Sequence, residues 1–250
     1  MNKKKILFIG HQAGLVGGAE DDLERILKYT SQSGAFYSTL LIPEGPRIKS
    51  YSRFVNNVIN YRIGYLPGLN TSLLDYIKYF LKFFIQAYEL LKKVNVSDYN
   101  ICVVNVTVLI FPALFLKFLN RKIKIVFWVR EMIKPDFIRN IVFWLINKIS
   151  SGVIFVSNGL KEEYLKRIGE NKNLIVLYSA SEPMEFFMNE KALEKVKQFF
   201  NQFCSFANAK FILNIGPVSP IKNQKLIIES LEKINSSSPD FFSLFLQFLL

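Results

Sequence analysis

A short apolar segment followed by closely spaced glycines constrains this chain more than any other feature of its sequence. Residues 6–9 (ILFI) are too few for a helix and are bounded by a glycine, as expected for a strand that is buried on both faces of a parallel sheet. An amphipathic segment then runs to Tyr29. A buried strand, a glycine-rich turn and a helix form the first half of a βαβ unit. The glycines of the turn are Gly10, Gly14, Gly17 and Gly18.

This turn has two interpretations that its spacing does not separate. Backbone N–H groups at the start of a helix, together with the positive end of the helix dipole, suit an anion such as phosphate. Glycine would let such a ligand approach the backbone. A turn that only redirects the chain from strand to helix explains the glycines equally well. The spacing is neither the G-x-G-x-x-G dinucleotide fingerprint nor a P-loop, because no Gly-Lys-Ser/Thr follows.

The composition indicates a folded chain with anionic partners. Half of the 250 residues are apolar, which is enough for one large or two small domains and excludes disorder as the overall class. The 32 basic and 20 acidic residues give a net charge of +12, which favours nucleotide phosphates, an acidic membrane surface or nucleic acid. We do not expect nucleic acid, because no basic–aromatic motif or recognition helix is apparent.

The rare residues limit the chemistry. Cys102 and Cys204 lie far apart in apolar surroundings, which predicts buried thiols in a reducing compartment and no metal site between them. His11 is the only histidine, so a site with several histidine ligands is impossible, and we expect neither a metal nor a cofactor. Only four apolar residues precede Gly10, too few for a signal peptide, and we therefore expect a cytoplasmic protein.

Buried strands and amphipathic helices alternate along the first 180 residues. This alternation predicts an α/β fold with a doubly wound, Rossmann-like parallel sheet. Further strands are expected at 37–42, 55–61, 101–106, 122–129, 152–156 and 174–177. Further helices are expected at 72–94, 111–119, 136–149 and 158–168, the last of them capped by Ser157.

The pattern changes after residue 180. A lysine-bearing helix at 189–203 precedes a buried strand at 210–215 and a helix at 223–234, and 241–250 reads as an apolar tail. A single strand and helix cannot bury both faces of a sheet. The sequence therefore predicts a Rossmann-like domain over 1–180, a hinge with a linker helix over 181–204, and an incomplete second Rossmann-like domain over 205–250.

With its elements placed, the chain resembles glycosyltransferase family 4, retaining sugar transferases of the GT-B fold. Four motifs carry the resemblance and follow one another in the family's order over residues 5–234. They are Gly17-Gly18-Ala19-Glu20; Val153–Ser157 followed by Leu160-Lys161-Glu162; Ile175–Ser179; and Phe211–Gly216 with Pro220, Lys222, Asn223 and Gln224.

The resemblance implies transfer of a sugar from a nucleotide-sugar to a glycan or lipid-linked acceptor, as in polysaccharide biosynthesis. Two Rossmann-like domains would face a cleft, the first holding most of the acceptor and the second most of the donor. The turn at Gly17 and Gly18 would lie near the reacting centre as an acceptor or phosphate loop. Lys222, with Gly216, would bind the donor diphosphate and neutralise it as the glycosidic bond breaks. The alternative for Lys222 is a solvated lysine at a helix start.

Four further residues are candidates for the cleft. Arg130 and Glu131 end a strand at the edge where open α/β sheets bind ligands. They could contact acceptor or donor, or simply pair with each other. His11 also follows a strand and could touch the acceptor, or be a loop histidine without such a role. Ser157 ends the strand of the second motif at a helix start.

The departures from the family pattern oppose full activity. Pro217 stands where the family usually has an arginine, which removes one of two cations for the diphosphate, and Ser179-Ala180 stands where Asn-Gly is common. The family's donor-binding E-x7-E motif lies beyond residue 250. We therefore expect a glycosyltransferase chain that is truncated and inactive unless a separate chain supplies the rest of the donor domain. The alternative is a non-catalytic acceptor-binding remnant or a subunit of a split enzyme. A dinucleotide enzyme is disfavoured by the missing fingerprint.

A membrane partner is also expected. The net charge of +12 and the predicted helix at 72–94, with lysines opposite an aromatic face, suggest peripheral attachment to the inner face of a membrane.

Overall fold

The structure is a computed structural model, and the chain divides into two compact units, Met1–Ala180 and Ser181–Leu250. It describes residues 3–14, 17–61, 92–133, 135–169, 173–179, 210–215, 223–235 and 241–246, with the single positions Lys78, Lys82, Leu90, Glu194, Lys195 and Gln198.

The first unit is built on a parallel sheet of seven strands in the order β3-β2-β1-β4-β5-β6-β7. The order reverses direction beside β1, as in doubly wound folds, and confirms the expected fold class. The strands are β1 Lys4–Ile9, β2 Phe36–Ile42, β3 Asn57–Asn60, β4 Ile101–Val104, β5 Lys124–Val129, β6 Ser150–Phe155 and β7 Leu174–Val176.

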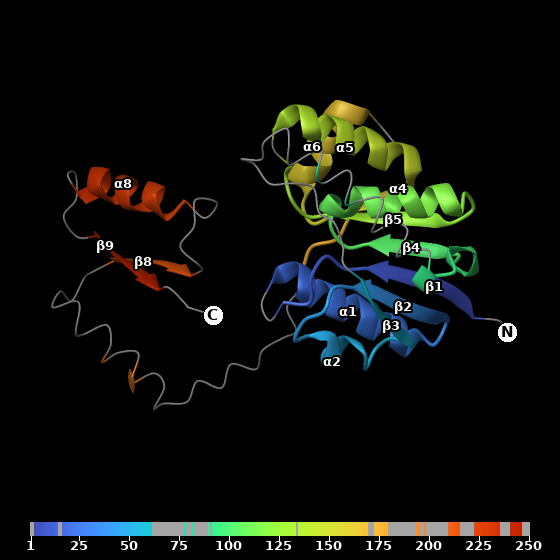
Figure 1. Cartoon of the computed structure of the whole chain (residues 1–250). Coiled ribbons are helices and arrows are strands. Elements are labelled where there is room, and N and C mark those ends of the chain that lie inside the picture. Colours follow the sequence, from blue (N-terminus) through green and yellow to red (C-terminus); the bar gives the residue numbers. More distant parts are fainter. Residues whose placement is uncertain are drawn as a thin grey trace. The chain divides into compact units, whose positions relative to one another are not determined.

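Helices cover both faces of this sheet, α1 and α2 on one side and α4, α5 and α6 on the other (Figure 1). The bounds of the helices are α1 Gly18–Ser33, α2 Ile48–Tyr51, α4 Ile110–Leu119, α5 Asp136–Ile149 and α6 Asn158–Ile168, with 3-10 turns η1 Val96–Asp98 and η2 Thr107–Leu109. Two helix ends follow from local sequence. Ser157 Oγ accepts a hydrogen bond from Leu160 N–H at 3.3 Å and caps α6. Gly34 ends α1 with φ of 61°, a conformation that glycine adopts without strain.

The apolar runs of the strands reflect this two-sided burial. Ile6 and Phe8 of β1 pack in the core under α1 and α2, whereas Leu7 and Ile9 pack in the core under the other helices. Successive side chains of a strand point to opposite faces, so a strand covered on both sides must be apolar throughout. Cys102 of β4 is fully buried in the second of these cores, and burial raises the pKa of its thiol.

The sequence located these elements well, with a few differences. The structure adds α2, η1 and η2, which are too short for periodicity to reveal. β4 ends at Val104, two residues before the expected strand does; the backbone N–H of Asn105 still donates to the carbonyl of Ile9 at 3.0 Å, and its Nδ2 donates to the carbonyl of Ala19. Most of the helix expected at 72–94 lies outside the described residues; the positions described within it before Val94 are helical.

The second unit contains β8 Lys210–Ile215, α8 Gln224–Asn235 and β9 Phe241–Leu246. β8 and β9 pair in parallel, with Lys210 opposite Phe241. The expected apolar tail at 241–250 is therefore wrong, because its first six residues form a strand that completes a β–α–β unit. An apolar run at the end of a sequence has no following turn signal, and only the pairing partner identifies it as a strand. Of the expected linker helix at 189–203, the described Glu194, Lys195 and Gln198 are helical.

In the described part of the chain, we find no helix with both the length and the hydrophobicity needed to cross a bilayer.

The loops that follow β1 and β2 pack closely against each other. Arg47 N–H donates to the carbonyl of Ala13 at 3.2 Å, and a Cβ at Gly45 would lie 2.5 Å from the same carbonyl oxygen. Gly45 is thus required by the close approach of two backbones.

We expect Gly45→Ala to lower the free energy of unfolding by about 1–3 kcal/mol, because the added methyl meets backbone atoms that cannot move independently. Gly159→Ala, in α6, is the matched control: no atom lies within 4 Å of its added Cβ. It should leave stability unchanged or raise it by up to about 1 kcal/mol. Urea unfolding of both variants measures this, and equal stabilities would contradict the assignment.

Candidate active site

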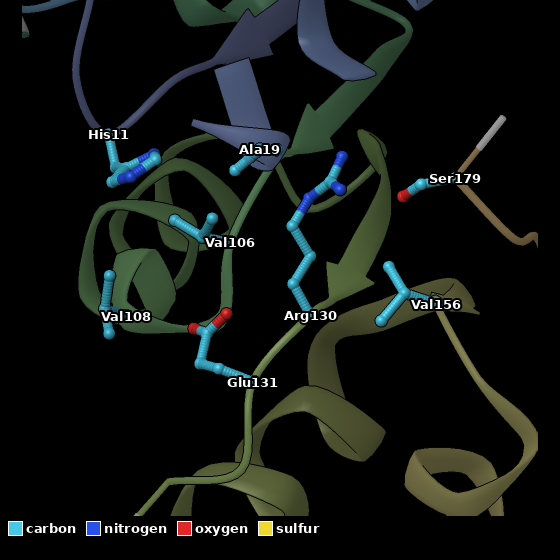
Figure 2. Close-up of a pocket in the computed structure, with 9 residues that line it drawn as sticks. His11, Ala19, Val106, Val108, Arg130, Glu131, Val156 and Ser179 are labelled. Atoms are coloured by element: carbon cyan, nitrogen blue, oxygen red, sulfur yellow. The ribbon is translucent and has the colours of Figure 1, made fainter. Parts of the chain in front are cut away.

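A pocket of about 430 Å³ opens at the carboxyl ends of the strands of the first unit. Its walls come from segments that follow β1, β4, β5, β6 and β7 and from the first turn of α1 (Figure 2). Parallel strands bring these segments to one edge, which is where open α/β sheets bind ligands. The lining residues are His11, Gly18, Ala19, Val106, Val108, Arg130, Glu131, Val156 and Ser179.

Arg130 contacts three neighbouring residues as well as the pocket. Its Nε donates to the carbonyl of Asn105 at 2.9 Å and its Nη2 to Asn105 Oδ1 at 3.0 Å, while its Nη1 lies 2.5 Å from Asp22 Oδ2. The guanidinium carbon lies 3.8 Å from the centre of the Trp128 ring. Burial lowers the pKa of Arg130, and Asp22 opposes this shift. Arg130 therefore joins the ends of β4 and β5 to α1.

Asp22 is the shared acceptor of this arrangement. Besides Arg130, its Oδ2 accepts a hydrogen bond from Ser179 Oγ at 2.5 Å, and its Oδ1 accepts from Arg25 Nη1 at 2.9 Å. Asp22 is buried and Arg130 is 8% exposed. A buried carboxylate with three donors ties together α1, the end of β5 and the segment after β7. We call Asp22, Asn105, Arg130 and Ser179 the Asp22 network.

Glu131 faces the pocket from the opposite wall. Its Oε1 accepts a hydrogen bond from the backbone N–H of Thr107 at 3.2 Å. Burial raises the pKa of Glu131, while the Thr107 hydrogen bond and the charge of Arg130 oppose the shift. The sequence left open an ion pair between Arg130 and Glu131. In the structure the two side chains bind different partners, because Arg130 is engaged by Asp22 and Asn105.

His11 is paired with a buried carboxylate from the glycine-rich turn. Its Nε2 lies 3.4 Å from Glu20 Oε1, and Glu20 is buried. Burial lowers the pKa of His11; the negative charge of Glu20 opposes this shift and the positive charge of Arg130 adds to it. The dipole of α1 alone would account for Glu20 from the sequence, but its carboxylate in fact turns back toward the pocket wall.

The two glycines of the turn have different roles. Gly17 precedes α1, and an added Cβ there would overlap with Glu20 Oε2. Gly18 lines the pocket, and nothing lies within 4 Å of the Cβ it lacks. Gly17 is thus explained by packing against Glu20, whereas Gly18 leaves the backbone open to the pocket.

The structure brings four of the residues named from the sequence into one pocket: His11, Gly18, Arg130 and Glu131. Ser157 caps α6 instead, and its neighbour Val156 lines the pocket. Lys222 and Gly216 lie outside the described residues. Sequence reasoning missed Asp22, Asn105 and Ser179, because each is an ordinary polar residue until the fold brings Asp22 and Asn105 to Arg130 and Ser179 to Asp22. Within the described residues, no three His, Cys, Asp or Glu side chains cluster as metal ligands would.

The sequence matches no family model and no curated protein. The fold, in contrast, matches solved structures. HepE from Anabaena in complex with UDP and glucose aligns over 99% of this chain with a TM-score of 0.65 and 18% identity. A glycosyltransferase from Rickettsia africae aligns over 98% with a TM-score of 0.56 and 14% identity. MnaA from S. aureus bound to UDP aligns over 98% with a TM-score of 0.56 and 12% identity.

This chain spans 62%, 60% and 62% of the length of these three proteins, respectively. At such identities the likeness shows a shared fold. It confirms the Rossmann-like α/β fold of the GT-B type that the resemblance implied.

Substitutions at two neighbouring residues of α1 should have unequal effects on stability, because only one of the residues belongs to the Asp22 network. Asp22→Ala should lower the free energy of unfolding by about 3–5 kcal/mol, since it leaves the buried charge of Arg130 without its carboxylate. The neighbouring Asp21→Ala removes a half-exposed carboxylate that pairs with Arg47 and should cost at most about 1 kcal/mol. Urea unfolding followed by tryptophan fluorescence reports on the first unit, which contains Trp128 and Trp144. Similar losses in both variants would contradict the network's role.

The structure predicts the direction in which the pKa of His11 is shifted, and a titration can measure it. As the only histidine, it gives one imidazole signal by NMR, and its midpoint should lie below the ordinary value of about 6.5. Glu20→Gln should lower the midpoint further, because it removes a charge that favours the protonated ring. The unfolded chain protonates His11 at a higher pH than the folded chain does. The contribution of His11 to the free energy of unfolding is therefore fully present above pH 6.5 and decreases as the pH falls below that value. A midpoint at or above 6.5 would refute the assignment.

Proposed function

We propose that this chain acts in glycosyl transfer from a nucleotide-sugar. The observation that carries the proposal is the pocket at the strand ends of a fold that aligns, over 99% of this chain, with a protein solved with UDP and glucose. The first unit would hold the acceptor in this pocket. The second unit would hold the donor diphosphate through Lys222 and Gly216, as the motif around them suggests.

The pocket's polar groups suit an acceptor that carries hydroxyl groups. Glu131 and His11 present a carboxylate and an imidazole on facing walls, and both can form hydrogen bonds with sugar hydroxyls. Arg130 is different, because three of its five N–H donors are engaged by Asp22 and Asn105. We assign it the role of holding the walls in place. Gly18 would let the acceptor or a phosphate approach the backbone.

The finer assignment to glycosyltransferase family 4, with a glycan or lipid-linked acceptor, rests on the four sequence motifs. We propose that the reaction takes place in the cytoplasm without a metal or cofactor, and that Lys222 stabilises the departing diphosphate by its charge. Pro217, where the family usually has an arginine, favours a second candidate: a non-catalytic acceptor-binding chain that works with a separate donor-binding partner.

Lys222→Ala tests the donor half of the proposal. Calorimetric titration of the full chain with UDP, UDP-glucose, GDP-mannose and ADP-glucose should show binding of at least one nucleotide-sugar. Lys222→Ala should weaken that binding about 10- to 100-fold, as expected for loss of a charged hydrogen-bond donor. Lys225→Ala is the matched control, since Lys225 is largely exposed and pairs with Glu229 on the same helix; it should bind as the unchanged chain does.

The outcomes separate the candidates. Binding that depends on Lys222, with sugar release or transfer, supports the enzyme. Absence of binding to every nucleotide-sugar, with binding of a glycan or lipid-linked acceptor, supports the non-catalytic chain. Absence of binding to every nucleotide-sugar and to every acceptor overturns both.

A further inference from the structure

α5 carries apolar residues both on the face that packs against the sheet and in a row on its outer face. Val142, Phe143 and Ile146 are buried against the sheet, while Phe137, Ile141 and Trp144 are exposed. The exposed three are spaced i, i+4 and i+7, which places them in one row along the helix. We call this row the α5 stripe. Trp144 is 52% exposed.

The neighbouring helix α4 also exposes a large apolar side chain. α4 packs beside α5 in the layer on the same face of the sheet (Figure 1), and its Phe118 is 73% exposed. Single exposed apolar residues are ordinary, but a row of large ones on a helix indicates a surface that another body covers.

Basic residues adjoin the carboxyl end of the stripe. Lys148 continues the row at i+11, and its Nζ lies 6.0 Å from the centre of the Trp144 ring. Because Ser150 lies opposite Ile125 in the sheet, the end of α5 lies beside the start of β5 and the segment that precedes it. These positions carry three further exposed cations, Arg121, Lys122 and Lys124. At the other end of the stripe, the carboxylate of Asp136 is engaged by Arg139 and Arg167.

We propose that the α5 stripe, with Phe118 and these four cations, docks on an anionic membrane surface. Aromatic and aliphatic side chains would enter the interface while the lysines and Arg121 contact lipid phosphates. The charge decides between occupants. Association with a second copy would bring together two chains that each carry a net charge of +12, whereas a bilayer of anionic lipid complements both these cations and that net charge.

This proposal is independent of glycosyl transfer, but it has a consequence for it. α5 begins five residues after Glu131, so one end of the stripe lies near the pocket wall. Docking through the stripe would hold the pocket close to the membrane, where a lipid-linked acceptor resides. The surface differs from the helix at 72–94 that the sequence suggested, most of which lies outside the described residues.

The two tryptophans make a direct test. Trp128 is 3% exposed and Trp144 is 52% exposed, so fluorescence changes on docking come from Trp144. Vesicles of phosphatidylglycerol and phosphatidylcholine at low salt should sediment the full chain, and bromine-labelled acyl chains should quench its emission. Vesicles of phosphatidylcholine alone should do neither. Trp144→Ser should weaken sedimentation about tenfold. Tyr29→Ser, at a more exposed aromatic on α1, should not.

Charge reversal gives the second arm. Lys148→Glu should weaken vesicle binding at least about tenfold, since each charge near an anionic surface contributes about fivefold and the substitution replaces a favourable charge with an unfavourable one. Lys225→Glu, the same change on α8, should have a much smaller effect. Thermal unfolding verifies that each variant is folded.

Three results would overturn the proposal. They are no sedimentation with anionic vesicles, sedimentation without quenching of Trp144, and a dimer by light scattering that Trp144→Ser dissociates, which would identify a second copy as the occupant. Because no nucleotide-sugar is present, failure here leaves the proposed function standing. Failure of nucleotide binding likewise leaves the membrane surface standing.

Discussion

The candidate site depends on one buried ion pair, Arg130 with Asp22. Separating a buried guanidinium from its carboxylate would leave an uncompensated charge in the protein interior, so the two residues hold their elements together. The cost of burial is offset by the groups around them: Asn105 accepts twice from Arg130, and Ser179 and Arg25 donate to Asp22. The pair thereby links the start of α1 with the ends of β4 and β5 and with the segment after β7. These segments form most of the pocket walls, which also include residues after β1 and β6.

The Arg130–Asp22 ion pair explains why the polar residues of the pocket have different roles. Arg130 has the charge expected of a phosphate-binding residue, yet three of its five N–H donors bind groups within the protein. Glu131 and His11 each have a partner on the wall behind them, Thr107 and Glu20, and burial shifts the pKa of each toward its neutral form. Burial is the largest cause of both shifts, and each shift acts against a charge on the side chain.

The α-helical layers of the first unit serve two purposes. α1 both covers one face of the sheet and supplies Gly18, Glu20 and Asp22 to the site. α5 covers the other face with one side and presents an apolar row on its other side. A helix that only covered the sheet would carry polar residues outward. The pocket and the α5 stripe belong to the same unit and are supported by the same sheet. The position of the pocket is therefore fixed relative to the proposed membrane surface.

The sequence by itself determined the architecture of the first unit. Short apolar runs separated by amphipathic segments predict a parallel sheet covered on both faces, because only such a sheet buries every side chain of its strands. It also located His11, Gly18, Arg130 and Glu131, since residues that follow buried strands must meet at one edge. Tertiary structure alone decided what these residues do. The sequence made Arg130 a candidate ligand-binding residue, whereas in the structure it pairs with Asp22. Glu20 could be explained from the sequence by the start of a helix, whereas in the structure it pairs with His11. β9 became a strand through pairing with β8. Each outcome depends on contacts between residues distant in the chain or on side-chain directions, neither of which a local pattern encodes.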